Sequence, residues 1–136
     1  MRDTIDINSN DNALFITSQC NNRCVMCCQP PLLRNDLDGY FQKNMALIDS
    51  APRELRSLGI TGGEPTLLGD RLFELLRHVR TKLPETEIHL LTNGRAFADK
   101  EYARKLAECG EEKILLGVPL HADSAGDQRY YHAGER

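Results

Sequence analysis

The sequence lacks the apolar run of roughly 18 residues that a membrane-spanning helix needs, and its polar first residues lack the apolar centre of a signal peptide. It also lacks an excess of positive charge, because 17 lysines and arginines face 20 aspartates and glutamates. The net charge of -3 therefore gives no basic surface for nucleic acid or an anionic membrane. Internal repeats and low-complexity tracts are absent as well. We therefore expect a single domain of a cytoplasmic protein, with neither a membrane nor a nucleic acid as partner.

Cysteine is present in an odd number, and the five residues are unevenly spread. Cys20, Cys24 and Cys27 lie within eight residues, in the spacing Cys-x3-Cys-x2-Cys. Such close spacing suits a metal or redox site in a reducing compartment better than a framework of disulfides. A 4Fe-4S cluster normally takes four cysteine thiolates, so a loop that offers three would leave one iron free to hold another molecule. An open metal position usually indicates chemistry, as catalytic zinc sites show by analogy.

Apolar patterns predict alternating strands and helices after a flexible polar arm at residues 1–12. Short apolar runs predict strands at residues 13–17, 55–60, 87–92 and 113–118, the first of them buried on both faces. Helical spacing predicts helices at residues 40–49, 70–83 and 99–109, with Asp70 as the N-cap of the second. The alternation predicts an α/β fold in which residues 13–136 form one domain around a parallel sheet with right-handed crossovers.

Each candidate motif comes directly after a predicted strand. The cysteine loop follows the first strand, and three further motifs follow the others: Gly62-Gly63-Glu64-Pro65, Asn93-Gly94 and His121. Barrel and open α/β enzymes place their active sites at these strand ends. Glycine there lets a ligand approach the backbone closely, and Glu64 can present a carboxylate to a cationic amino group. Asn93 suits either a turn or the wall of a cofactor pocket, and His121 could face an active site.

Other interpretations of the cysteines remain open at this point. A structural zinc site would need a fourth ligand, usually from a second closely spaced pair. A thioredoxin-like pair of Cys24 and Cys27 would leave Cys20 unexplained. Neighbouring side chains of an extended loop point in opposite directions, so Cys28 is predicted to be a bystander thiol. Cys109 lies on the apolar face of a predicted helix, which favours a place in the core.

The cysteine triad followed by Gly62-Gly63-Glu64-Pro65, about 35 residues after Cys27, resembles the radical S-adenosylmethionine (SAM) enzymes. The resemblance implies that the three cysteines hold a 4Fe-4S cluster whose open iron binds the methionine end of SAM. It implies that Gly62, Gly63 and Glu64 position that methionine moiety, that Pro65 shapes the turn, and that Asn93 joins the cofactor site. Further segments resemble one branch, the radical maturase of the His-Xaa-Ser peptide system: residues 14–17, 29–31, 60–70, 91–95 and 118–120.

This resemblance also carries expectations about fold and activity. It implies a partial (β/α) barrel with about four βα units, as the N-terminal part of a core domain truncated at its C-terminus. In the related maturases a helix begins near the position of residues 132–134. The implied activity is reductive cleavage of SAM to a 5'-deoxyadenosyl radical that modifies a ribosomally synthesised His-Xaa-Ser peptide. A companion maturase and a flavodoxin- or ferredoxin-type electron donor would be partners. The alternatives are a small-molecule or RNA substrate, and, in another class, a small zinc-binding interaction module.

Overall fold

The computed structural model describes residues 5–133, in which strands and helices alternate as the sequence predicted. Four strands form one parallel sheet in chain order: β1 (Ala13–Phe15), β2 (Ser57–Thr61), β3 (Glu87–Leu91) and β4 (Ile114–Gly117). The α-helices are α1 (Leu37–Ser50), α2 (Asp70–Lys82), α3 (Lys100–Ala107) and α4 (Ala125–Ala133). Three short 3-10 helices complete the order: η1 (Pro65–Leu68), η2 (Arg95–Ala98) and η3 (Glu111–Lys113). The predicted fold class, an α/β partial barrel with a parallel sheet, is confirmed.

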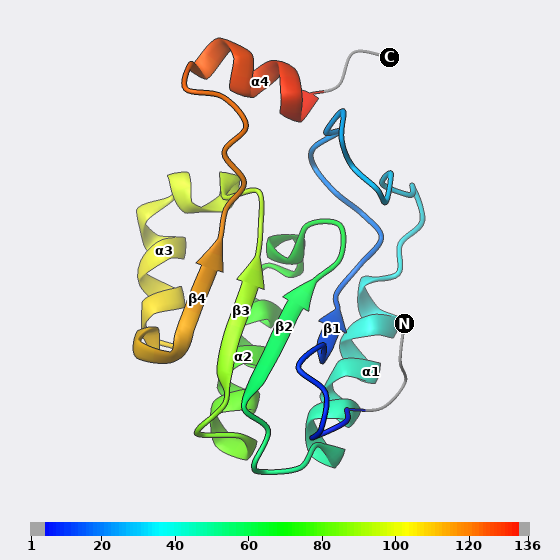
Figure 1. Ribbon diagram of the computed structural model, residues 1–136, viewed down its shortest axis with the longest axis vertical. Helices are drawn as coiled ribbons and strands as arrows, with labels where there is room; N and C mark the ends of the chain where they lie inside the picture. The colour runs from blue at the N-terminus through cyan, green and yellow to red at the C-terminus, as the bar shows by residue number, and fades with distance from the viewer. Residues whose placement is uncertain (1–4, 134–136) are drawn as a thin grey trace.

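The first three helices lie side by side along the sheet, as Figure 1 shows. Arg71 of α2 pairs with Asp38 of α1 at 2.5 Å, and Lys105 of α3 pairs with Asp70 of α2 at 2.9 Å. Between helices and sheet lies a core of fully buried apolar side chains, drawn from alternate strand positions and from α1 and α2. Its members at 2% exposure or less are Leu14, Ile16, Ile48, Leu55, Leu58, Ile60, Leu72, Phe73, Leu75, Leu76, Val79, Leu83, Ile88 and Leu90.

Two expectations about local structure are corrected. The first strand is not buried on both faces, because Leu14 is fully buried but Ala13 is exposed and no described element covers it. Asp70 is the first residue of α2 rather than its N-cap; Gly69 holds the cap position with φ +61°, a left-handed angle that favours glycine. The last described helix, α4, begins at Ala125 and was not predicted; of residues 132–134, at whose position a helix begins in the related maturases, the last lies outside the described part.

The described part of the N-terminal arm carries no helix or strand, as expected, but one side chain organises it. Asn12 is buried, accepts a hydrogen bond from the Asp6 amide, and donates to the carbonyls of Asp6 and Ser9. Its own carbonyl accepts from the Gly59 amide at 2.8 Å, which joins the arm to β2. Residues 6–12 thus form a turn that hydrogen bonds hold against β2, rather than the flexible arm that was expected. No helix among the described residues is long and apolar enough to cross a membrane.

β4 forms one edge of the sheet, since it pairs only with β3 among the described residues. Apolar side chains are exposed on β4 and just after it, including Leu115 at 56% and Leu120 at 80%. An apolar cavity of about 440 Å³ opens between β4 and α3, lined in part by Phe97, Leu106 and Leu116. The edge of β4 and this cavity thus form an apolar surface that the described residues do not cover.

Candidate functional site

The cysteine loop and the Gly62–Pro65 turn meet at the carboxyl ends of the strands, because parallel strands end at the same edge of the sheet (Figure 1). Two backbone hydrogen bonds join them: the Gly63 amide donates to Thr17 O at 2.7 Å and the Glu64 amide donates to Gln19 O at 2.8 Å. The start of the cysteine loop therefore runs alongside the turn. The structure brings together two motifs that lie some 40 residues apart in the sequence.

The two glycines of the turn are required by this close packing. A Cβ on Gly63 would lie 1.9 Å from Gln19 O, and one on Gly62 would lie 2.7 Å from Thr17 O. Gly62 also has φ +133°, an angle that side chains other than glycine rarely adopt. The close backbone approach expected from the sequence is present, and the group that approaches is the backbone of the cysteine loop.

The three predicted ligands lie on this loop with different exposures. Cys20 and Cys24 are half-buried, whereas Cys27 and its neighbour Cys28 are exposed. Cys20 Sγ accepts a hydrogen bond from the Asn22 amide at 3.3 Å, and the Cys27 thiol donates to the carbonyl two residues later. The loop thus presents two thiols toward the protein and one toward solvent.

Burial is the main cause that raises the pKa of the Cys20 and Cys24 thiols. The charge of Glu64 and that of Cys24 add to this at Cys20, and the charge of Cys27 adds to it at Cys24. Hydrogen bonds from Asn22 act in the opposite direction on both thiols, since they favour the thiolate.

The donor set fits an iron-sulfur cluster better than a closed structural zinc site. Within residues 5–133 no three histidine, cysteine or acidic side chains are gathered closely enough to hold a single metal ion. A closed zinc site takes four ligands around one ion, whereas a 4Fe-4S cluster takes thiolates at separate irons. Three neighbouring thiols on one loop at the carboxyl ends of the strands fit the second arrangement.

Glu64 is 1% exposed, and its carboxylate accepts four hydrogen bonds at this end of the sheet. Its Oε1 accepts from the Thr66 amide at 3.0 Å and from the Thr66 and Thr92 hydroxyls, each at 2.7 Å. Its Oε2 accepts from the Asn93 amide at 2.7 Å. A carboxylate offers about four acceptor positions, and the four bonds are shared unevenly, with three on Oε1 and one on Oε2. The carboxylate joins the turn to the end of β3, a role that the sequence did not reveal.

Pro65 and Asn93 complete the turn and the neighbouring strand end. Pro65 is buried at the first position of η1, where its missing N–H costs no hydrogen bond. Asn93 Oδ1 accepts from the Arg95 amide at 3.0 Å, which makes it a turn residue, with Gly94 at φ +79° inside the turn. Asn93 Nδ2 also donates to Asn21 Oδ1 at 2.7 Å and lies 4.0 Å from Cys20 Sγ. One side chain therefore shapes the turn and contacts the cysteine loop.

The structure places the other candidate residues apart from this cluster. His121 is exposed. Its backbone amide donates to Gln128 Oε1 at 2.8 Å, and its ring centroid lies 6.1 Å from that of Tyr131. Tyr131, in α4, in turn accepts a hydrogen bond at its carbonyl from the Val25 amide at 3.0 Å, which connects α4 to the cysteine loop. Cys109 is 3% exposed beside Phe73, so the prediction of a core residue is confirmed.

Asp36 accepts hydrogen bonds from the residues that directly precede the cysteine loop. Its carboxylate accepts from the Thr17 hydroxyl at 2.5 Å, from the Ser18 amide at 3.1 Å and from the Ser18 hydroxyl, and it pairs with Arg34 at 3.4 Å. Burial alone would raise the pKa of Asp36, but the hydrogen bonds from Ser18 and Thr17 and the charge of Arg34 outweigh it and lower the pKa. The carboxylate therefore joins residues 17 and 18 to the start of α1.

We expect Asp36→Asn to destabilise the protein by about 1.5 kcal/mol at neutral pH, because hydrogen bonds to an ionised acceptor are lost. A lowered pKa in the folded state means that the ionised group stabilises the protein above its unfolded pKa. That contribution is lost as the pH falls through the folded pKa. Urea unfolding of both proteins should therefore show a difference that shrinks below about pH 4. Asp38→Asn, at an exposed ion pair, serves as the control with little effect; an Asp36→Asn difference that is constant with pH would contradict the role of the charge.

Comparison with known proteins extends this picture. The family model described as the radical SAM superfamily matches residues 14–132. The probable GTP 3',8-cyclase of Metallosphaera sedula is 32% identical over 114 residues, which cover 82% of this chain and 34% of that protein. The GTP 3',8-cyclase of Desulforamulus reducens is 30% identical over 132 residues, which cover 93% of this chain and 40% of that protein.

One solved structure, described as native anSMEcpe with bound AdoMet and Cp18Cys peptide, is similar with a TM-score of 0.51 and 26% identity. The match covers 83% of this chain and 31% of that one. This chain therefore spans between a third and two fifths of the length of the two curated relatives. The superfamily uses a 4Fe-4S cluster and SAM, and the similar solved structure has AdoMet bound.

Proposed function

Because this chain belongs to the radical SAM superfamily, we propose that Cys20, Cys24 and Cys27 bind three irons of a 4Fe-4S cluster and that SAM binds at the fourth iron. The single observation that carries the proposal is the packing of the three-thiol loop against the Gly62–Pro65 turn at the carboxyl ends of β1 and β2. A cluster with SAM supplies one-electron chemistry, cleaving SAM to a 5'-deoxyadenosyl radical. The chain itself supplies ligands, orientation and charge.

We assign a separate role in SAM binding to each residue around the cysteines. Gly62 and Gly63 allow the turn to lie against the cysteine loop, so a molecule held by the loop also meets the turn. Glu64 Oε2 accepts one hydrogen bond against three on Oε1, so it is the oxygen that would receive the ammonium group of a methionine moiety. Asn93 lies between Glu64 and Cys20. Pro65 fixes the turn that carries the carboxylate. The proposed SAM-binding residues are thus Gly62, Gly63, Glu64, Pro65 and Asn93.

Replacement of Glu64 by Gln tests whether the Glu64 carboxylate binds SAM. The substitution keeps the size of the side chain and removes its charge, so we expect SAM affinity to fall about tenfold to a hundredfold, the value of a charge-assisted hydrogen bond. Iron content after reconstitution should change little. Calorimetric titration of the reconstituted protein with SAM measures the affinity.

The matched control is Thr92→Val, which removes one hydrogen bond to Glu64 but keeps the carboxylate charge. It should lower stability by about 1 kcal/mol and leave SAM affinity close to that of the unmodified protein. Equal affinity in all three proteins would make Glu64 a purely structural carboxylate and would remove it from the SAM site.

For the substrate, we propose a ribosomally synthesised peptide with His-Xaa-Ser motifs, modified together with a companion maturase. Support comes from the segments that resemble that branch, such as residues 91–95 and 118–120, and from a similar solved structure that holds a peptide. A flavodoxin- or ferredoxin-type protein in the cytoplasm would supply the electron. A short gene rich in His-Xaa-Ser codons beside this one would support the peptide, and its absence would count against it.

A second candidate is a nucleotide-like small molecule, favoured by the two curated relatives named GTP 3',8-cyclase. The two candidates differ in what accelerates SAM cleavage. Formation of 5'-deoxyadenosine under dithionite should rise on addition of the peptide in the first case and of GTP in the second. A colourless protein with one bound zinc and no cleavage would instead favour a zinc-binding interaction module.

A further inference from the structure

Arg95 reaches from the end of β3 to the middle of the cysteine loop, more than 70 residues earlier in the sequence. Its Nη1 donates to the Asn21 carbonyl at 2.9 Å and to Asn22 Oδ1 at 3.0 Å. Asn22 is only 5% exposed, and its side chain in turn hydrogen-bonds Cys24. The Asn22 side chain therefore links the Arg95 guanidinium to the thiol of Cys24.

The position of Arg95 is itself fixed from two sides. Its backbone amide donates to Asn93 Oδ1, while Asn93 Nδ2 donates to the Asn21 side chain at 2.7 Å. The backbone of Asn93 is held by Glu64. A continuous set of hydrogen bonds thus runs from the buried carboxylate through the end of β3 to residues 21 and 22.

Within residues 5–133, two backbone hydrogen bonds also hold this part of the loop. Between Cys20 and Cys27 the backbone bonds are one turn, from the Cys27 amide to Cys24 O, and the contact between Val25 and Tyr131. A loop that must present three thiols together loses conformational entropy when it does so. Contacts that fix the loop beforehand lower that cost, and Arg95 and Asn93 supply such contacts at its centre.

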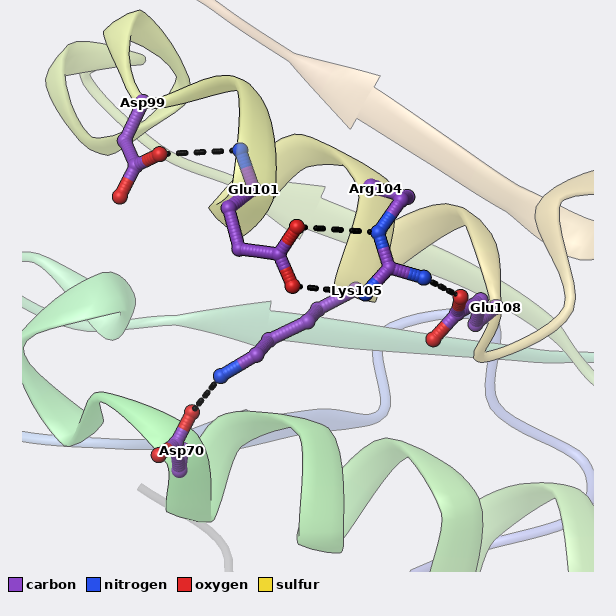
Figure 2. A network of polar contacts seen from close by, with 6 residues as sticks. All are labelled: Asp70, Asp99, Glu101, Arg104, Lys105 and Glu108. Carbon is purple, nitrogen blue, oxygen red and sulfur yellow. Dashed lines mark hydrogen bonds and ion pairs between the residues drawn. The ribbon is translucent and has the colours of Figure 1, made fainter.

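Arg104 makes the contacts that are usual for an arginine on an exposed helix surface, and it serves as a comparison for Arg95. Figure 2 shows Arg104 on α3, where its guanidinium pairs with Glu101 and Glu108 of the same helical segment. Its partners are exposed carboxylates one turn away, and such pairs contribute little to stability. The partners of Arg95 are a backbone carbonyl and a buried asparagine on a distant loop.

We propose that Arg95 is a positioning residue for the cluster: it holds residues 21 and 22 so that the Asn22 side chain faces Cys24 and the thiols are presented together before metal arrives. The inference rests on the proposed function, since it takes the three cysteines as ligands. Hydrogen bonds to cluster sulfurs and their orientation tune reduction potential. Loss of Arg95 should therefore loosen the metal-free loop and lower the potential of the reconstituted cluster.

The first readout uses the metal-free protein and trypsin, which can cleave after the exposed Arg23 inside the loop. Cleavage there requires local opening of the loop. In Arg95→Met, mass spectrometry at early times should show cleavage after Arg23 about threefold to tenfold faster than in the unmodified protein. Arg95→Lys should restore most of the protection, because both contacts come from one nitrogen that an ammonium can replace. Arg104→Met, the matched control, should leave the rate unchanged.

The second readout is the midpoint potential of the reconstituted cluster, which general loss of stability would not shift in a defined direction. It should be lower in Arg95→Met and in Asn22→Ala, and the double variant should show no further decrease, because the two residues act in one chain of contacts. Unchanged trypsin cleavage in Arg95→Met, equal acceleration in Arg104→Met, or an unchanged potential would each overturn the proposal. If the unmodified protein took up no iron, the proposed function would fail, and the trypsin readout would still decide whether Arg95 holds the loop.

Discussion

Cys20→Ala, Cys24→Ala and Cys27→Ala are each expected to abolish the brown colour and broad visible absorption that anaerobic reconstitution with iron and sulfide should give the unmodified protein. The physical reason is ligand number, since the loop supplies three thiolates to a cluster that normally takes four. With two thiolates left, the cluster should be lost rather than weakened. Iron and sulfide analysis together with the absorption spectrum measures the outcome.

Cys28→Ser and Cys109→Ala are the matched controls for this series. Cys28 is also exposed and is adjacent to Cys27, so it tests the choice of ligand directly. Cys109 is buried against Phe73, away from the loop. Both variants should keep most of the iron. If Cys28→Ser lost the colour as completely as Cys27→Ala, the ligand assignment would be wrong.

Gly63→Ala is the second substitution with a large expected effect. Its Cβ would lie 1.9 Å from Gln19 O, so the turn or the cysteine loop must shift and the bond from the Glu64 amide to Gln19 O is strained or lost. Overpacking against backbone typically costs about 1–3 kcal/mol, and the hydrogen bond adds about 1 kcal/mol. We expect a loss of about 2–4 kcal/mol in urea unfolding of the metal-free protein, a large share of the stability of a typical domain.

Gly39→Ala provides the opposite control within the same chain. Gly39 lies in α1 with nothing within 4 Å of an added Cβ and without a positive φ. Alanine is the better helix former, so this variant should be as stable as the unmodified protein or more stable by up to about 1 kcal/mol. Equal stability of the Gly63 and Gly39 variants would contradict the close packing of turn and loop.

The order of strands and helices was predictable because apolar periodicity reports burial, and burial follows the fold. Element ends were less predictable for the same reason. Leu55 was assigned to a strand that in fact begins at Ser57, since Leu55 is 2% exposed and belongs to the core without belonging to the sheet. Its carbonyl accepts instead from the Thr86 hydroxyl at 2.6 Å. A hydrogen bond to a residue 31 positions away cannot be predicted from the apolar pattern around Leu55.

The candidate site was likewise predictable in part: its residues could be located from the sequence, but their contacts could not. The sequence located the cysteines, the glycine turn and Asn93 because each follows a strand, and parallel strands bring their ends together. It did not reveal that Glu64 binds Thr92 and Asn93, or that Arg95 binds Asn21 and Asn22. These bonds join residues about 28 and 74 positions apart, and their geometry is set by side-chain rotamers that no spacing rule encodes.

The most direct test of the three-thiol cluster is electron paramagnetic resonance of the reconstituted, dithionite-reduced protein, recorded with and without saturating SAM alongside iron and sulfide analysis. We predict equal amounts of iron and sulfide, with the signal of a reduced 4Fe-4S cluster that changes on addition of SAM, because the iron without a cysteine ligand is the one that SAM reaches. Bound zinc without iron, or a cluster signal that SAM leaves unchanged, would contradict the assignment of Cys20, Cys24 and Cys27 to an open cluster.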